Sequence, residues 1–375
     1  MSRAKIAVFI PSLMGGGAER VALFCANSLS QAGYDVDLVV ARSAGPLADD
    51  PIAKRLRVDL GAPNEMLCLP HLVKYVRRAA PDLMIAMVHS AKIMAGLAKL
   101  FVPDLRLVIS VHNNLDLANA DHFWVRRYFG FGLERRLYRN VEAAHAVSLA
   151  LAAQVEQYFG IPRDHIYTIY NPLIEIEPTP QLPDDRKRWF DRPVIMTAGR
   201  MVPQKDHVGL IKAFRDAKLA GSARLLILGD GPLGPDLAIL AKELGLEGDI
   251  LMPGRVADIR PYLDAATGFA LSSRFEGLPL VLIEALRAGL PIVAYDCPTG
   301  PAEALANGAL GRLLTPGDIA GFAQALRDMV SGDLAAPDPR LASEQLARFS
   351  PPTIAQGYVQ LVRDCLLRTS ASGSP

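Results

Sequence analysis

The chain has 375 residues, of which 50% are hydrophobic and 21% charged, with a formal net charge of +1. This length exceeds one ordinary hydrophobic core and favours two domains, while the near-neutral charge lacks the basic field of a nucleic-acid-binding protein. The cysteines stand far apart without paired spacing, which indicates neither a disulfide framework nor a zinc site: Cys25, Cys68, Cys297 and Cys365.

Hydrophobic runs in the first hundred residues do not predict a signal peptide or a membrane span. Lys5 and the apolar residues 6–10 imitate a signal peptide, but Pro11 ends the run at strand length. The longer apolar window at 83–102 contains a histidine and two lysines. We therefore expect a cytoplasmic protein without a spanning segment.

Short runs of β-forming residues alternate with helical patterns along the whole chain. The strands predicted in the first half are 5–10, 35–41, 83–88, 106–112, 143–148 and 166–170, with helices at 19–31 and 91–100. The strands predicted in the second half are 193–198, 224–228, 250–253, 267–273 and 291–295, with helices at 208–218, 234–244, 259–265 and 280–288. Apolar strands alternating with helices favour an α/β fold with two parallel, doubly wound, Rossmann-like sheets.

The predicted domains are 1–172 and 193–350. Residues 173–192 between them are rich in proline and charge and have little periodicity, which is typical of a linker. A last helical pattern covers 350–367, and the tail after Arg368 should be loose. Ligands of open α/β sheets bind beyond the carboxyl ends of the strands, so two such domains facing one another would enclose a cleft.

The loop after the first strand contains three consecutive glycines, Gly15, Gly16 and Gly17. Glycines at a strand–helix turn allow a ligand to approach the backbone closely, although a plain flexible turn has the same composition. A dinucleotide-binding fingerprint requires a glycine where Arg20 stands, so the loop does not predict a dehydrogenase.

Histidines follow two strands of the first half. His112 and Asn113 end an apolar strand, where an imidazole in a cleft would contact substrate, although a structural histidine is equally compatible. His89 and Ser90 end the preceding strand and could line an acceptor pocket.

Residues 123–139 combine arginines with Trp, Tyr and Phe in a helical pattern. Such a segment is typical of a helix that rests on anionic lipid headgroups without crossing the membrane. A solvated helix with its aromatic residues in the core would have the same pattern. The balanced total charge disfavours nucleic acid as a partner.

Loops of the second half carry cations and glycines. Arg200 and Lys205 flank the start of a helix, where cations and free N–H groups would bind a diphosphate, unless they are ordinary surface cations. Gly229 and Gly231, in the turn after the next strand, leave room for a flat ring, unless they are only turn glycines. The main-chain groups of Arg255 and Val256, after the following strand, could form hydrogen bonds with the edge of that ring.

Residues 271–289 form a predicted strand–loop–helix unit with two acids. Glu276 lies in the loop and Glu284 just over one turn into the helix, which Pro279 should begin. Singly, each glutamate is typical of a solvated residue near a helix start. The unpaired N–H groups of Gly277 and Leu278 attract negative charge, so the loop suits a ligand with both phosphates and hydroxyls.

Two spaced motifs, Glu276-(seven residues)-Glu284 with its Phe-Glu-Gly-Leu-Pro loop and Gly-Arg-(four residues)-Lys from Gly199, carry a resemblance to a known family. They resemble the retaining glycosyltransferases of the GT-B fold, specifically glycosyltransferase family 4. The resemblance covers nearly the whole chain and is strongest from Gly199 to Gly300. It implies an acceptor-binding domain at 1–172, a nucleotide-sugar donor-binding domain at 193–350, and a C-terminal segment, 351–375, whose helix returns to the first domain.

The resemblance also implies roles for individual residues. Near the donor phosphates and the reacting sugar it places Gly16, Gly17, His112, Arg200, Lys205, Glu276, Gly277, Leu278 and Pro279. Around the nucleobase and ribose it places Gly229, Gly231, Arg255, Val256 and Glu284. On the acceptor side it places Glu19, Arg20, His89 and Asn113. Of these, His112, Glu276, Arg200 and Lys205 are the predicted catalytic group.

These roles predict a retaining hexosyltransferase. It would move a sugar from a UDP- or GDP-sugar to a lipid-linked or saccharide acceptor in the synthesis of lipopolysaccharide, capsule or exopolysaccharide, on the inner face of the cell membrane. No acidic metal-binding motif follows a predicted strand, so Arg200, Lys205 and the helix start should stabilise the leaving phosphate without a metal or other cofactor. The alternatives are a GT-B nucleotide-sugar epimerase, which needs no acceptor, and a noncatalytic nucleotide- or sugar-binding protein.

Overall fold

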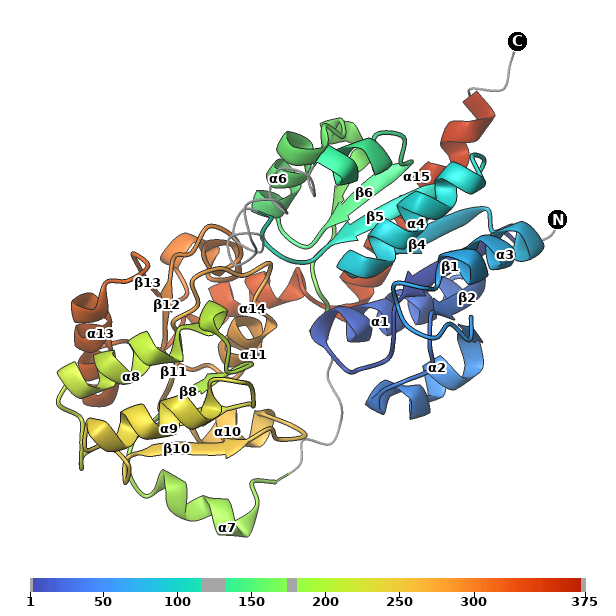
Figure 1. Ribbon diagram of the computed structural model, residues 1–375. Helices are drawn as coiled ribbons and strands as arrows, with labels where there is room; N and C mark the ends of the chain where they lie inside the picture. The colour runs from blue at the N-terminus through green and yellow to red at the C-terminus, as the bar shows by residue number, and fades with distance from the viewer. Residues whose placement is uncertain (1–2, 116–131, 174–180, 372–375) are drawn as a thin grey trace. The chain divides into compact units, whose positions relative to one another are not determined.

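The computed structural model describes residues 3–115, 132–173 and 181–371, and the chain forms two compact units (Figure 1). Unit 1 comprises Met1–Pro172 and Ser350–Pro375, and unit 2 comprises Leu173–Phe349. Each unit contains one parallel sheet with its own hydrophobic core. The predicted α/β class with two doubly wound domains is confirmed.

Unit 1 has a seven-stranded sheet in the order β3-β2-β1-β4-β5-β6-β7. Its strands are β1 Lys5–Ile10, β2 Asp35–Val40, β3 Arg57–Asp59, β4 Leu83–Ala86, β5 Leu107–Val111, β6 Ala143–Ala146 and β7 Ile166–Thr168. The central strands β1, β4, β5 and β6 are buried along nearly their whole length, because helices cover both faces of a parallel sheet. Their carboxyl ends therefore meet at one edge and carry the loops of interest.

The helices of unit 1 are α1 Gly17–Gln31, α2 Pro51–Leu56, α3 Leu69–Ala79, α4 His89–Phe101, α6 Leu149–Phe159 and α15 Pro351–Ala371, and residues 132–137 are also helical. The C-terminal helix α15 belongs to unit 1 and packs beside α1, as the family resemblance implied. It continues to Ala371, so the chain is helical beyond Arg368, where a loose tail was predicted.

Unit 2 has a six-stranded parallel sheet in the order β10-β9-β8-β11-β12-β13. Its strands are β8 Val194–Ala198, β9 Arg224–Leu228, β10 Ile250–Gly254, β11 Gly268–Leu271, β12 Ile292–Tyr295 and β13 Arg312–Leu314. Its helices are α7 Asp184–Lys187, α8 His207–Asp216, α9 Gly234–Glu243, α10 Arg260–Ala265, α11 Leu280–Arg287, α12 Pro301–Ala304, α13 Ile319–Ser331 and α14 Pro339–Ala347.

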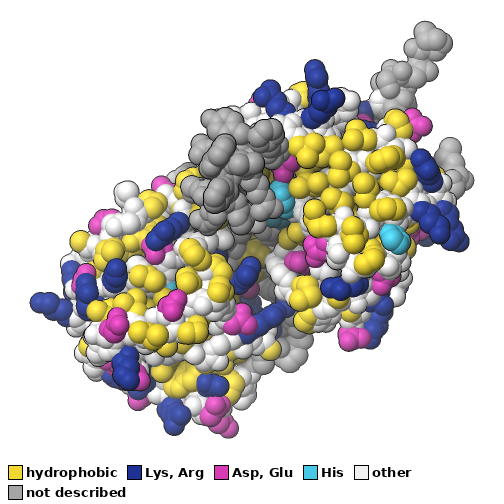
Figure 2. All heavy atoms as spheres, in the orientation of Figure 1, with side chains coloured by type: hydrophobic (Ala, Val, Ile, Leu, Met, Phe, Trp, Pro, Cys, Tyr) yellow, Lys and Arg dark blue, Asp and Glu magenta, His cyan; other side chains and the backbone are white. Residues whose placement is uncertain are grey.

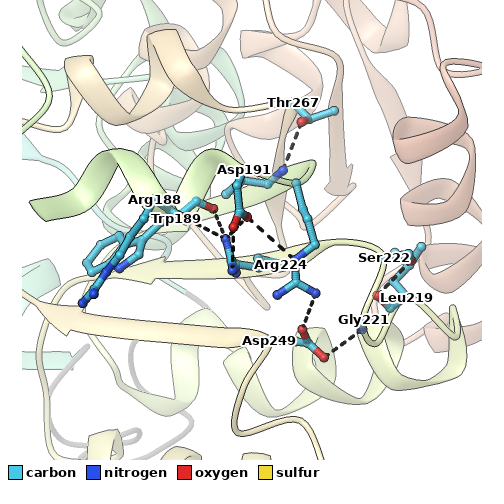
Figure 3. A network of polar contacts seen from close by, with 11 residues as sticks. Arg188, Trp189, Asp191, Leu219, Gly221, Ser222, Arg224, Asp249 and Thr267 are labelled. Carbon is cyan, nitrogen blue, oxygen red and sulfur yellow. Dashed lines mark hydrogen bonds and ion pairs between the residues drawn. The ribbon is translucent and has the colours of Figure 1, made fainter. Parts of the chain in front are cut away.

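The end of the predicted linker packs on unit 2 (Figure 3). Arg224, the first residue of β9, donates to the carbonyl oxygens of Arg188 and Trp189 at 2.9 Å and forms an ion pair with Asp191. The neighbouring Arg192 donates to Asp249 at 3.0 Å. These charge-assisted contacts attach the region from α7 to Arg192 to the edge of the sheet. At least this part of the predicted linker 173–192 is therefore attached to unit 2.

The sequence analysis did not predict several short strands and several helices. β3 and β13 contain three residues each, too few to show a periodicity. The missed helices α6, α13 and α14 start at capping residues that the sequence contains. The side chains of Ser148, Asp318 and Asp338 accept hydrogen bonds from backbone N–H groups of the first helical turn.

The packing of α15 gives a stability prediction. Leu361→Ala should lower the free energy of unfolding of unit 1 by about 2–5 kcal/mol, because the side chain is fully buried and its loss leaves a cavity. Leu367→Ala on the same helix is the matched control, since that side chain is exposed. Chemical denaturation of both variants measures the difference, and equal effects would show that α15 is not part of the core.

Candidate active site

Three strand-end loops of unit 2 are joined by backbone hydrogen bonds. The Gly199 N–H donates to the Leu228 carbonyl at 2.9 Å, and the Met201 N–H donates to the Asp230 carbonyl at 2.7 Å. The Gly229 N–H in turn donates to the Gly254 carbonyl at 3.0 Å. The loops after β8, β9 and β10 thus lie side by side at the carboxyl edge of the sheet.

Glycine is required twice in this cluster. Gly229 has a φ of +133°, and a Cβ there would collide with the carbonyl oxygen of Gly199. Gly231 has a φ of +155°, and a Cβ there would lie 2.7 Å from the Met201 nitrogen. Because both neighbours are backbone, a larger residue could be accommodated only by moving a loop. Gly229 and Gly231, which were predicted to lie around a nucleobase, therefore allow the loop of Arg200 and Lys205 to pack closely against the loop after β9.

The central feature of the cluster is an ion pair between Lys205 and Glu276. The ammonium Nζ of Lys205 lies 2.5 Å from Oε1 of Glu276, and Glu276 is only 6% exposed. Ser272 Oγ donates to the Lys205 carbonyl at 2.8 Å, and the Gln204 amide donates to the Phe275 carbonyl at 2.8 Å. The loops after β8 and β11 are thereby locked together, and two predicted site residues that are 71 positions apart in the chain meet.

The loop from Glu276 to Pro279 is supported by the segment after β12. Thr299 Oγ1 donates to the backbone carbonyl of Glu276, and Gly300 has a φ of +95°. A Cβ at Gly300 would lie 2.6 Å from Pro279 Cδ and 3.0 Å from the Gly277 carbonyl oxygen. Tight packing on this side holds Glu276, Gly277 and Pro279, with Leu278 also buried.

Helix α11 begins at the first residue of the predicted range 280–288, and Pro279 precedes its first turn instead of starting it. Pro279 is its N-cap and Leu280 its first residue, with no side-chain hydrogen bond capping this end. Backbone N–H groups in the first turn of a helix have no intrahelical partners and, with the helix dipole, favour an anion. Glu284 follows on the second turn and is half-buried.

The other donor-side residues differ in exposure. Arg200 is exposed, and its guanidinium makes no hydrogen bond or ion pair with any residue that the structure describes. Arg255 is also exposed, whereas Val256 is half-buried at the end of the β10 loop. Arg200 follows β8 by two residues, so a cation with no protein partner stands in the same loop as Lys205.

In unit 1, His112 ends a chain of hydrogen bonds. Its Nε2 lies 2.8 Å from Ser110 Oγ, which lies 2.6 Å from His145 Nδ1, and His145 Nε2 lies 2.7 Å from the Ile169 carbonyl oxygen. A carbonyl only accepts, so His145 Nε2 carries a proton and the neutral ring accepts at Nδ1 from Ser110. Ser110 then accepts from His112 Nε2–H, which leaves His112 Nδ1 as an acceptor.

Both imidazoles are held in the neutral form. Burial, with the nearby His145 and Lys92, lowers the pKa of His112 well below its ordinary value. Burial lowers the pKa of His145 to about 4. At neutral pH the His112 ring can therefore receive a hydrogen bond from a hydroxyl group, but it supplies no positive charge.

Sequence reasoning missed Lys92, Ser110, His145 and Asn171 in this region. Lys92, in the first turn of α4, is only 4% exposed, and burial lowers its pKa to about 8 against the opposing effect of Glu134. Asn171 is buried beside His112, and a hydrogen bond with its side chain opposes the lowering of the His112 pKa. The sequence signal for Lys92 was its position, one turn into a helix that follows an apolar strand.

The predicted acceptor-side residues of unit 1 lie mostly at the surface. His89 begins α4, is exposed, and lies 3.4 Å from the buried carboxylate of Glu134. Arg20 and Asn113 are exposed, while Glu19 is half-buried.

The glycine loop after β1 leads directly into α1. Gly16 is the N-cap of α1 and Gly17 its first residue, and both are exposed. Among the three glycines only Gly15 takes a positive φ, of +89°. A Cβ at Gly16 would meet the Glu19 carboxylate, the end of a flexible side chain that can move aside.

Two further sequence predictions concern metals and membranes. In the ranges 3–115, 132–173 and 181–371 there is no cluster of three or more His, Cys, Asp or Glu able to hold a metal ion. Within the same ranges no helix has the length and apolar character needed to cross a bilayer. Of the predicted membrane-resting segment 123–139, residues 123–131 lie outside the described part of the chain. In the remainder, Tyr138 is buried, whereas Arg135, Arg136 and Arg139 are exposed.

The neutral state of His145 predicts a pH dependence of stability. Between pH 6.5 and about 4 the unfolded chain binds a proton at this residue that the folded chain does not. The free energy of unfolding should therefore fall as the pH is lowered through this range, by on the order of 3 kcal/mol from this residue at its full extent. In His145→Gln, denaturation of unit 1 at pH 7, 5.5 and 4.5 should show a smaller fall, and an unchanged fall would exclude His145 as the cause.

Comparisons with known proteins agree with this architecture. Residues 15–173 match the family described as Glycosyltransferase Family 4, and residues 192–332 match the family described as Glycosyl transferases group 1. The lipopolysaccharide core biosynthesis glycosyltransferase LpsE of Rhizobium meliloti is 26% identical over 354 residues, which cover 92% of this chain and 96% of the relative.

Two other similar proteins have names or titles that refer to substrates. The N-acetylgalactosamine-N,N'-diacetylbacillosaminyl-diphospho-undecaprenol 4-alpha-N-acetylgalactosaminyltransferase of Campylobacter jejuni is 28% identical over 347 residues, covering 88% of this chain and 91% of the relative. The crystal structure of Anabaena Alr3699/HepE in complex with UDP-glucose has a TM-score of 0.77 at 22% identity and covers 96% of this chain and 99% of that one. With its two Rossmann-like units and these family matches, the chain belongs to the GT-B glycosyltransferases of group 1 and family 4.

Proposed function

We propose that this glycosyltransferase is a retaining, metal-independent enzyme that transfers a hexose from a UDP-sugar to a lipid-linked or saccharide acceptor of a bacterial-type surface glycan. The observation that carries the proposal is the Lys205–Glu276 ion pair. The loop of Lys205 also carries the exposed Arg200, and the loop of Glu276 leads into the uncapped start of α11. Cations and free N–H groups suit a diphosphate, and a carboxylate suits sugar hydroxyls.

Support for the substrates comes from similar proteins. One solved structure with the same fold contains UDP-glucose, which favours a UDP-sugar over a GDP-sugar. The Rhizobium relative is named for lipopolysaccharide core synthesis and the Campylobacter relative for a diphospho-undecaprenol acceptor. These names favour an acceptor of surface-glycan assembly, with the enzyme on the inner face of the cell membrane.

On the donor side, Lys205 and Arg200 would hold the diphosphate. An ammonium has three N–H donors, so Lys205 can keep its bond to Glu276 while it also donates to a phosphate oxygen. The leaving phosphate gains negative charge as the glycosidic bond breaks. Fixed cations and the α11 N–H groups, aimed at that charge in advance, would stabilise the transition state without a metal or cofactor.

Glu276 would bind the transferred sugar. Its Oε1 faces Lys205, which leaves Oε2 as an acceptor for a sugar hydroxyl. A carboxylate so closely paired with a cation is a weak nucleophile, unlike the carboxylate that attacks the sugar in retaining glycosidases. We therefore assign retention to attack by the acceptor from the face that the phosphate leaves.

The nucleoside would occupy the glycine-bounded edge of unit 2. Gly229 and Gly231 leave room for a flat ring, and the main chain of Arg255 and Val256 would read its edge. Glu284 on α11 would accept hydrogen bonds from the ribose hydroxyls.

Unit 1 would contribute the acceptor side. His112, neutral and with Nδ1 as an acceptor, would receive a hydrogen bond from a sugar hydroxyl near the reacting carbon. The family resemblance assigns the acceptor to Glu19, Arg20, His89 and Asn113, and contacts to the donor phosphate to Gly16 and Gly17.

Removal of either member of the central pair tests this assignment. Lys205→Met should lower kcat/KM for transfer from UDP-glucose or another accepted UDP-sugar roughly a hundredfold or more, because a fixed transition-state cation is lost. Glu276→Gln should also lower it, through lost contacts to the sugar. Lys242→Met on the surface of α9 is the control and should act like the wild type.

The same assays separate the alternative functions. A panel of UDP- and GDP-sugars is incubated with and without candidate acceptors, and nucleotide release is followed beside sugar identity. Release that depends on an acceptor supports transfer. Sugar isomerisation without an acceptor would establish an epimerase, and binding without turnover would establish a noncatalytic protein.

The glycine contacts give a second test of the donor site. Gly229→Ala should abolish UDP binding measured by calorimetry, because the new Cβ would displace the loop that carries Arg200 and Lys205. Gly254→Ala meets no atom within 4 Å and has only the strain of a φ of +84°, at a cost of about 1–2 kcal/mol. If both variants bound UDP equally, the loops would not form the binding site.

A further inference from the structure

Helices α3 and α4 of unit 1 present exposed apolar side chains. Met66 and Leu67, just before α3, are 66% and 57% exposed, and Leu100 and Phe101, at the end of α4, are 66% and 57% exposed. Figure 2 shows hydrophobic side chains gathered on the face of unit 1 that lies over α4. Large contiguous apolar areas are unusual on soluble monomers and mark interaction surfaces.

The two helices form one continuous surface. α3 packs beside α4, and the Arg77 guanidinium donates to the Phe101 carbonyl oxygen at 3.2 Å. This contact holds the C-terminal ends of the helices together. Between the exposed ends, the outward side chains Val73, Ile93 and Leu97 are half-buried and apolar. We call this area the α3–α4 surface.

The charged side chains on α3 and α4 are all basic. Lys74, Arg77 and Arg78 are exposed on α3, and neither α3 nor α4 contains an aspartate or glutamate. The acids that bracket α3 in the sequence are engaged elsewhere. Glu65 accepts from the hydroxyls of Ser12 and Ser90, and Asp82 accepts from the backbone of Lys5.

Lys74 and Arg78 have no ion-pair partner among the described residues, so their charge is not neutralised within the protein. Basic side chains beside exposed Leu, Met and Phe are the combination that favours the interface of an anionic bilayer. A protein partner with a matching acidic surface would not by itself require four exposed large apolar side chains.

We propose that the α3–α4 surface docks on the face of a membrane rich in anionic lipids. Leu100, Phe101, Met66 and Leu67 enter the headgroup region, and Lys74, Arg77 and Arg78 contact lipid phosphates. This surface is distinct from the segment 123–139 and requires no spanning helix. The proposal names the surface for the membrane location given in the proposed function, and it does not depend on the identity of the sugar donor.

Vesicle flotation with the full chain tests the proposal. Wild-type protein should float with vesicles that contain phosphatidylglycerol, float less as salt is raised, and remain unbound with vesicles of phosphatidylcholine alone. Arg78→Gln/Leu100→Ser should lower partitioning about thirtyfold, because each lost basic residue and each lost apolar contact weakens binding severalfold. Circular dichroism and the thermal midpoint should match the wild type, since both side chains are exposed.

The matched control makes the same two changes on unit 2. Lys242→Gln/Ile239→Ser removes one exposed lysine and one exposed isoleucine from α9 and should float like the wild type. Equal loss in both double variants would overturn the proposal, as would flotation that is unaffected by either. A wild-type chain that dimerises in light scattering, and becomes monomeric only in Arg78→Gln/Leu100→Ser, would assign the surface to a second copy of the chain and would also overturn it.

Discussion

A buried ion pair between Lys205 and Glu276 connects the loops on which the proposed donor site of this glycosyltransferase depends. A carboxylate this deeply buried is costly unless a cation and hydrogen bonds compensate it, and here Lys205 provides the compensation at 2.5 Å. Ser272 and Gln204 then fix the same two loops through their backbones. The geometry is set before any ligand arrives, and electrostatic catalysis requires this pre-organisation.

The surrounding glycines follow from the same constraint. The loop that carries Lys205 passes so close to the loop after β9 that Gly229 and Gly231 have no space for a side chain. On the other side, Thr299 and Gly300 close on the segment that carries Glu276. In unit 1 the site residue is oriented by hydrogen bonds and not by an ion pair. Ser110 and His145 orient a neutral His112 through hydrogen bonds that end at the Ile169 carbonyl. The central pair of unit 2 is thus ionic, whereas His112 of unit 1 is a neutral acceptor of hydrogen bonds.

The sequence predicted the α/β class and nearly all central strands, because buried parallel strands are apolar runs between helical patterns. The sequence did not predict edge strands of three residues, such as β13, or helices whose main signal is a capping residue, such as α14. It also identified Lys205 and Glu276 as partners in one site, through their position after strands whose carboxyl ends share an edge. The environment of Lys92 could not be predicted, since the carboxylate of Glu134 that opposes the lowering of its pKa lies far away in the sequence. Nor could the tautomer of His112, which depends on His145 and the Ile169 carbonyl.

The central claim is that Lys205 holds the diphosphate and Glu276 holds the sugar of one donor molecule. Calorimetry with UDP and with UDP-glucose, on the wild type, Lys205→Met and Glu276→Gln, tests it most directly. The account predicts that Lys205→Met weakens both ligands alike, whereas Glu276→Gln weakens UDP-glucose and leaves UDP as tight or tighter. Equal weakening of both ligands by Glu276→Gln, or no effect of Lys205→Met on UDP, would contradict it.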